Sequence, residues 1–166
     1  MESITTALDS RMLRPRRETG SLTRPLGLDA YRLPELIGSS VLVVEDEIPM
    51  QRQLELDLTE LDYEVRIAGS AGEAQQLLSQ ERVAGIILDL VLDDTEEAGW
   101  TLLCWIRQNH PGLPVIVFSA ALVNSASFRR AYELGASSYF VKGNGPMSHL
   151  YSELAARLVE GGRGRS

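Results

Sequence analysis

Short apolar runs recur along the chain and alternate with stretches of helical pattern. Residues 41–44, 84–88 and 115–118 contain no charged side chain, as expected of strands that are buried on both faces. Two further runs, which contain some polar residues, bring the expected strands to five: residues 63–68 and 138–141. Strict alternation with helices predicts a parallel sheet that is covered on both faces.

The helices between these strands are indicated by apolar spacing and by capping residues. Ser70 and Glu73 form a capping-box pattern, Gly135 is placed to end a helix, and Pro146 is placed to begin one. The expected helices cover residues 49–61, 71–79, 99–109, 125–134 and 146–160.

The chain of 166 residues is long enough for one domain and an extension. Residues 1–39, which are interrupted by three prolines, are expected to be an irregular N-terminal extension. It is either an unstructured tail or a docking arm for a partner. The domain is expected to span residues 40–160, and the glycine-rich residues 161–166 a disordered tail.

Composition limits the possible partners and compartment. The net charge of −7 argues against bulk nucleic-acid binding. No segment approaches the roughly 18 apolar residues of a membrane helix, and the N-terminus lacks the pattern of a secretory signal. A cytoplasmic protein that binds neither membrane nor nucleic acid is therefore expected.

Side chains suited to chemistry follow four of the five strands. Glu45 and Asp46 follow the first strand, Asp89 the third, Ser119 the fourth and Lys142 the fifth. The carboxyl ends of parallel strands share one edge of the sheet, where such folds bind ligands. These five side chains are therefore expected to meet.

Three carboxylates at one site repel one another unless a cation is present. Oxygen-only ligands favour Mg²⁺, which keeps several waters and takes few protein ligands. Lys142 is the only lysine among 16 basic residues and can act as a point-charge partner for a carboxylate or phosphate. Ser119 can donate to a phosphate oxygen, so the group suits phosphoryl transfer to a carboxylate.

Four segments carry a family resemblance: residues 43–47, 87–90, 117–120 and 139–142, which read VVEDE, ILDL, VFSA and YFVK. In this order and spacing they resemble the response-regulator receiver family of two-component signalling, over about residues 41–160. The resemblance implies a doubly wound, flavodoxin-like (βα)5 sandwich, as in CheY-like proteins. Its five-stranded parallel sheet would have the order 2-1-3-4-5.

The resemblance also implies roles at the site. Asp89 would accept a phosphoryl group from a histidine of a sensor kinase or phosphotransfer protein. Asp46 would bind Mg²⁺ directly and Glu45 through water, while Asp89 and the backbone carbonyl of Val91 would complete the protein ligands.

Three further residues would respond to phosphorylation. Ser119 would reorient to bond the phosphoryl group, and Lys142 would pair with the acyl phosphate. Tyr139 would be the aromatic switch residue that turns inward when Ser119 moves.

The sequence departs from the family pattern in three places. Gly143 follows Lys142 where the family usually has proline. The loop of residues 91–99 is acidic and about two residues longer than usual. Val91 and Ala121 occupy the two positions that tune phosphoryl hydrolysis in the family, and neither can position a water, so slow autodephosphorylation is expected.

The leading hypothesis is a stand-alone, non-enzymatic binding switch that meets its partner through the fourth helix, fifth strand and fifth helix. A phosphorelay intermediate, or the receiver part of a longer regulator, remains an alternative. A haloacid-dehalogenase-like phosphatase is disfavoured because Val91 stands where such enzymes have a second acid. Homodimerisation is left open.

Overall fold

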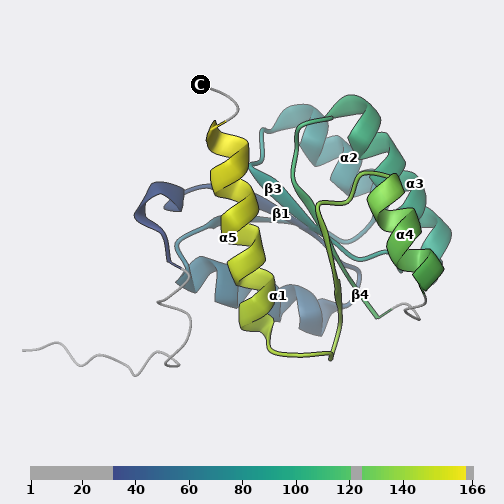
Figure 1. The fold of residues 1–166 in the computed structure, drawn as a ribbon, viewed down its shortest axis with the longest axis horizontal. Coiled ribbons are helices and arrows are strands. Elements are labelled where there is room, and N and C mark those ends of the chain that lie inside the picture. Colours follow the sequence, from purple (N-terminus) through teal and green to yellow (C-terminus); the bar gives the residue numbers. More distant parts are fainter. Residues whose placement is uncertain (1–31, 121–124, 164–166) are drawn as a thin grey trace, which may run out of the picture.

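The computed structural model describes residues 32–120 and 125–163 (Figure 1). A five-stranded parallel sheet has the order β2-β1-β3-β4-β5, which confirms the predicted fold class and strand order. The strands are β1 (Ser40–Val44), β2 (Glu64–Ala68), β3 (Gly85–Leu88), β4 (Val115–Ser119) and β5 (Ser138–Val141). The helices are α1 (Ile48–Glu60), α2 (Ala71–Gln80), α3 (Glu96–Asn109), α4 (Ser125–Glu133) and α5 (Met147–Arg163), preceded by the 3-10 turn η2 (Pro34–Leu36).

Two apolar layers hold the helices on the sheet. Leu54 of α1 and Leu154 of α5 pack with the β1 side chains Val41 and Val43 on one face. On the other face, side chains of α2, α3 and α4 pack against Leu42 and its neighbours. Because both faces are covered, the central strands are apolar at nearly every position, and serine stands only at the start of β1 (Ser40) and at the end of β4 (Ser119).

Parallel pairing aligns the carboxyl ends of the strands. Val44 of β1 lies opposite Leu88 of β3, and Ser119 of β4 lies opposite Val141 of β5. The residues that follow these positions are therefore brought to one edge of the sheet.

The capping residues that the sequence indicated lie at the start of α2. The Ser70 hydroxyl accepts a hydrogen bond from the Glu73 N–H, as in a capping box. The Glu73 carboxylate accepts one from the N–H of Gly69, the residue before the N-cap, so the return bond is displaced by one residue. Two expected helix boundaries were wrong. Helix α3 begins three residues before Gly99, at Glu96. Helix α5 continues to Arg163, so residues 161–163 are helical rather than a disordered tail.

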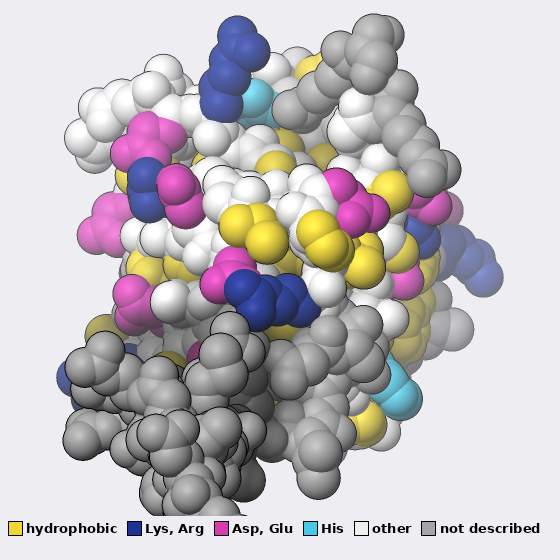
Figure 2. Space-filling view, turned by 90° about the vertical axis from the view of Figure 1, so that its left-hand side faces the viewer, with side chains coloured by type: hydrophobic (Ala, Val, Ile, Leu, Met, Phe, Trp, Pro, Cys, Tyr) yellow, Lys and Arg dark blue, Asp and Glu magenta, His cyan; other side chains and the backbone are white. Residues whose placement is uncertain are grey.

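The segment just before β1 packs on the domain. Leu36 of η2 is buried among side chains of α1 and α5, and Arg32 forms an ion pair with Asp62. Figure 2 shows the face on this side of the molecule, where hydrophobic side chains stand among acidic and basic ones. The rest of the expected extension, residues 1–31, lies outside the described residues.

None of the helices in the described part of the chain combines the length and apolar character needed to cross a bilayer.

Candidate functional site

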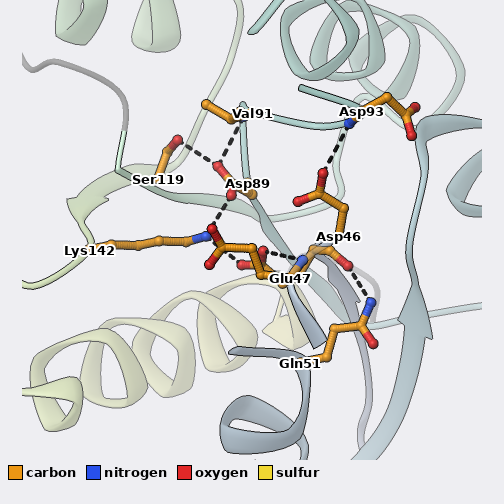
Figure 3. Close-up of polar contacts among 9 residues, drawn as sticks. Asp46, Glu47, Gln51, Asp89, Val91, Asp93, Ser119 and Lys142 are labelled. Carbon is orange, nitrogen blue, oxygen red and sulfur yellow. Dashed lines mark hydrogen bonds and ion pairs between the residues drawn. The ribbon is translucent and has the colours of Figure 1, made fainter. Parts of the chain in front are cut away.

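Asp89 lies at the centre of a polar cluster at the carboxyl edge of the sheet (Figure 3). It follows β3 directly, and its backbone N–H donates to the carbonyl oxygen of Val44 in β1 at 2.9 Å. Only 4% of the residue is exposed. A buried carboxylate requires hydrogen-bond donors, and the fold supplies three.

The three donors come from different strand ends. The Val91 N–H and the Ser119 hydroxyl both donate to Oδ1 of Asp89, at 3.0 Å and 2.6 Å. The Lys142 ammonium donates to Oδ2 at 2.5 Å. The structure thus brings Ser119 and Lys142 onto Asp89, as expected from the sequence.

Lys142 also contacts a second buried carboxylate. Its Nζ lies 2.6 Å from Oε2 of Glu45, whose other oxygen accepts the Glu47 N–H at 3.1 Å. Burial raises the pKa of Glu45, and the hydrogen bond from Lys142 opposes this only in part. Burial alone would lower the pKa of Lys142, but its bonds to Asp89 and Glu45 outweigh that effect and raise it.

Asp46 is the most accessible of the three carboxylates. It is half-buried, and its Oδ2 accepts a hydrogen bond from the Asp93 backbone N–H at 3.1 Å. Asp93 lies in the loop between β3 and α3, on the side of Asp46 away from Lys142 (Figure 3).

The acidic cluster fits a hard divalent cation. Glu45, Asp46 and Asp89 each offer a carboxylate oxygen, and these atoms lie within 4.8 Å of one another. Lys142 contacts two of the three carboxylates, but its single positive charge offsets only one negative charge, so the cluster retains an excess of negative charge. Oxygen-only donors with residual charge are what Mg²⁺ requires.

Tyr139 lies on β5 with its side chain buried. Its ring packs against Phe128 of α4 with centroids 4.7 Å apart, and burial raises the pKa of its phenol. The hydroxyl finds no hydrogen-bond partner among the described residues. The predicted switch residue is therefore turned inward and connects β5 to α4.

Three contacts at the site were missed by the sequence reasoning. Gln51 donates to the Glu45 carbonyl oxygen at 2.5 Å, Asp93 holds Asp46, and Phe128 packs on Tyr139. The Asp93-Asp94 pair, a composition that suits a tight turn, was the only one of these with a sequence signal.

The departures from the family pattern are partly visible. Gly143 has a φ of 77° and open space where a side chain would stand. Val91 is half-buried beside Asp89. Ala121 lies outside the described residues. The loop after Asp89 is shorter than residues 91–99 because α3 has already begun at Glu96.

The fold and the site define the class of protein: an α/β domain with an aspartate, a hydroxyl and a lysine at one edge of a parallel sheet. Residues 41–154 match the response regulator receiver domain family. The chain belongs to that family.

Relatives with known names agree with this assignment. The transcriptional regulatory protein GltR of Pseudomonas aeruginosa is 32% identical over 123 residues, which are 73% of this chain and 48% of GltR. The probable transcriptional regulator ycf27 of Cyanophora paradoxa is 32% identical over 124 residues, 75% of this chain and 48% of that protein. The chain therefore spans about half the length of these relatives.

A solved structure shows the same fold. The CheY-like receiver domain protein from Methanospirillum hungatei superposes with a TM-score of 0.69 at 24% identity. The match covers 76% of this chain and 98% of the other.

Proposed function

We propose that this receiver domain is a phosphorylation switch whose phosphoacceptor is Asp89 and whose cofactor is Mg²⁺. The phosphoryl donor is a phosphohistidine on a sensor kinase or a histidine phosphotransfer protein. The observation that carries the proposal is the set of contacts around Asp89, a buried carboxylate within hydrogen-bond distance of both a hydroxyl and an ammonium group.

In the transfer, a carboxylate oxygen of Asp89 attacks the donor phosphorus, and the bond from phosphorus to the imidazole nitrogen breaks. The departing nitrogen takes up a proton, and an acyl phosphate remains on Asp89. When bound, Mg²⁺ supplies positive charge that offsets the repulsion between the carboxylates and the phosphoryl oxygens. Glu45, Asp46, Asp89 and the Val91 carbonyl are the residues that would hold it.

Ser119 and Lys142 give up contacts with Asp89 to receive the product. Each now donates to an Asp89 oxygen, and a phosphoryl group on that carboxylate offers new acceptors nearby. Lys142 remains between Glu45 and the acyl phosphate as a compact charge. The movement of Ser119 is the step that starts the conformational change.

Tyr139 carries that movement to the surface. Its ring already packs on Phe128 of α4, so a change at Ser119 can alter how α4 sits on β5. The face formed by α4, β5 and α5 is therefore proposed as the surface that a partner protein reads.

Acetyl phosphate labelling tests the acceptor. The chain is incubated with Mg²⁺ and acetyl phosphate, and intact mass is measured for the wild type and for Asp89→Asn. We expect a base-labile phosphoryl adduct on the wild type only. An adduct of equal yield on Asp89→Asn would refute the assignment, and Asp57→Asn, a carboxylate on α1 away from the site, serves as the matched control.

The same switch could act alone or inside a longer regulator. We propose the stand-alone form, as the sequence suggested, although the longer relatives favour an attached output domain. An immunoblot of the native protein decides between these forms. A band near the 18.3 kDa of this chain supports the first, and a band about twice as large supports the second.

A further inference from the structure

The loop between β3 and α3 folds into a hairpin of four residues beside the carboxylate cluster. Leu92 and Thr95 exchange backbone hydrogen bonds in both directions, each 3.0 Å long. Between them, Asp93 and Asp94 have φ values of 52° and 61°. Positive φ at both central positions is what a type I′ turn requires, and aspartate tolerates it better than most side chains.

The hairpin is held in place by packing. Leu90 and Leu92 are fully buried, and α3 begins directly after Thr95. Gly99 of α3 lies so close that a Cβ there would come within 2.2 Å of the Leu90 carbonyl oxygen. The turn is therefore anchored at both ends, which fixes the direction of its N–H groups.

One of those N–H groups is aimed at the cluster. The Asp93 N–H donates to Oδ2 of Asp46 at 3.1 Å (Figure 3). Lys142 contacts Glu45 and Asp89 but forms no described ion pair with Asp46. The turn thus supplies Asp46 with a hydrogen-bond donor, as Lys142 does for Glu45 and Asp89.

We propose that the hairpin of residues 92–95 is a positioning element for Asp46. The Asp93 N–H holds one carboxylate oxygen so that the other is oriented toward a divalent cation shared with Glu45 and Asp89. This inference rests on the proposed function, because the cation is assigned there. A ligand that is already oriented loses less freedom when the metal binds.

Paired substitutions at positions 93 and 94 distinguish the effect of the backbone conformation of the turn from the effect of its negative charge. Asp93→Asn with Asp94→Asn removes both charges but keeps side chains that tolerate positive φ. Asp93→Val with Asp94→Val removes the same charges and opposes the turn, since β-branched residues avoid positive φ. Glycine at both positions restores the turn without any side chain.

Binding of Mn²⁺ is measured by electron paramagnetic resonance of the free ion, with Mg²⁺ as competitor. We expect the asparagine and glycine pairs to bind Mn²⁺ with similar affinity. The valine pair should bind roughly tenfold more weakly, which is the scale of losses seen when groups that orient metal ligands are removed. Equal affinity of the valine and asparagine pairs would overturn the proposal.

A second measurement leaves the turn sequence unchanged and so does not depend on the valine pair folding well. In ¹⁵N–¹H spectra, the Asp93 amide resonance should shift upfield when Asp46→Asn removes its charged acceptor. An unchanged resonance would show that the hydrogen bond does not form in solution and would sink the proposal. A wild type that binds no Mn²⁺ would instead refute the metal site in the proposed function.

Discussion

Lys142 is the residue that connects two buried carboxylates of the site. A single ammonium lies 2.6 Å from one buried carboxylate and 2.5 Å from another, and only 9% of its side chain is exposed. A compact charge with three donors can serve both partners and still turn toward a phosphoryl group. The planar guanidinium of arginine, which the chain uses everywhere else, has a fixed fork that is less suited to this exchange.

Tyr63 gives a pH-dependent prediction at the residue scale. Its hydroxyl is buried without a partner among the described residues, and burial raises its pKa from 10.0 to about 12. Because the folded state favours the neutral phenol, this contribution to stability is complete below pH 10 and is lost as pH rises toward about 12.

Tyr63→Phe should therefore flatten the loss of stability in that pH window and change little at neutral pH. Urea unfolding at a series of pH values, followed by circular dichroism, measures this. Parallel curves for the two proteins above pH 10 would show that Tyr63 is not the group responsible.

The residue types at positions 91 and 121 predict a long-lived phosphoryl group. Val91 is apolar and half-buried beside Asp89, and alanine stands at position 121. Neither side chain can accept a hydrogen bond from an attacking water, so the acyl phosphate should persist for minutes rather than seconds. Intact mass, followed after acetyl phosphate is removed, measures its decay, and Val91→Asn should accelerate it. Decay within seconds in the wild type would contradict the prediction.

At the scale of elements, Gly99 makes the contact between α3 and the end of β3 possible. A Cβ at this position would lie 2.2 to 2.5 Å from backbone atoms of Leu90, and backbone cannot rotate away as a side chain can. Gly99→Ala should lower the free energy of unfolding by about 2 kcal/mol or more.

Gly72 of α2 is the matched control for that substitution. It is also helical, but a Cβ there meets nothing within 4 Å. Gly72→Ala should be neutral or stabilising by up to about 1 kcal/mol, since alanine favours helix. Similar effects of the two substitutions in urea unfolding would argue against the close approach at Gly99.

The turn η2 extends the domain ahead of its first strand. Leu36 is 7% exposed and Ile37, its neighbour, is 54% exposed. Leu36→Ala should destabilise the protein by about 2 kcal/mol, because it empties a buried site next to α5. Ile37→Ala should have an effect within about 0.5 kcal/mol, as for most surface positions. Equal losses in thermal unfolding would mean that η2 does not dock as the structure shows.

At the scale of the whole molecule, the site and the proposed partner surface lie on connected elements. Ser119 ends β4 and Lys142 follows β5, and Tyr139 joins β5 to α4 through Phe128. Helix α2 packs against β2, the strand at the opposite edge of the sheet from β5.

Hydrogen exchange should reveal this connection. Addition of Mg²⁺ with beryllofluoride, which mimics a phosphoryl group, should slow amide exchange in α4 and β5 and leave α2 unchanged. Mass spectrometry of peptic fragments measures the pattern, and Asp89→Asn is the control that should show no response. Protection confined to the residues around Asp89 would contradict a switch that reaches α4.

The sequence was sufficient for the fold and for the five central side chains. Strand burial, helix spacing and capping are local properties, so the alternation, the sheet edge and the meeting of Glu45, Asp46, Asp89, Ser119 and Lys142 could be predicted. The ends of helices were harder to predict. The start of α3 was missed because the acidic residues after Asp94 are compatible with a loop and with a first helical turn.

Only the tertiary structure decided how the cluster is held. The bond from the Asp93 N–H to Asp46 depends on two backbone angles and on the buried anchors of the turn. The partner of Tyr139 depends on where α4 packs, and the burial of Leu36 in η2 depends on how α1 and α5 pack beside it. Each of these contacts joins residues from different elements of the fold, so no local sequence pattern could specify the pairing.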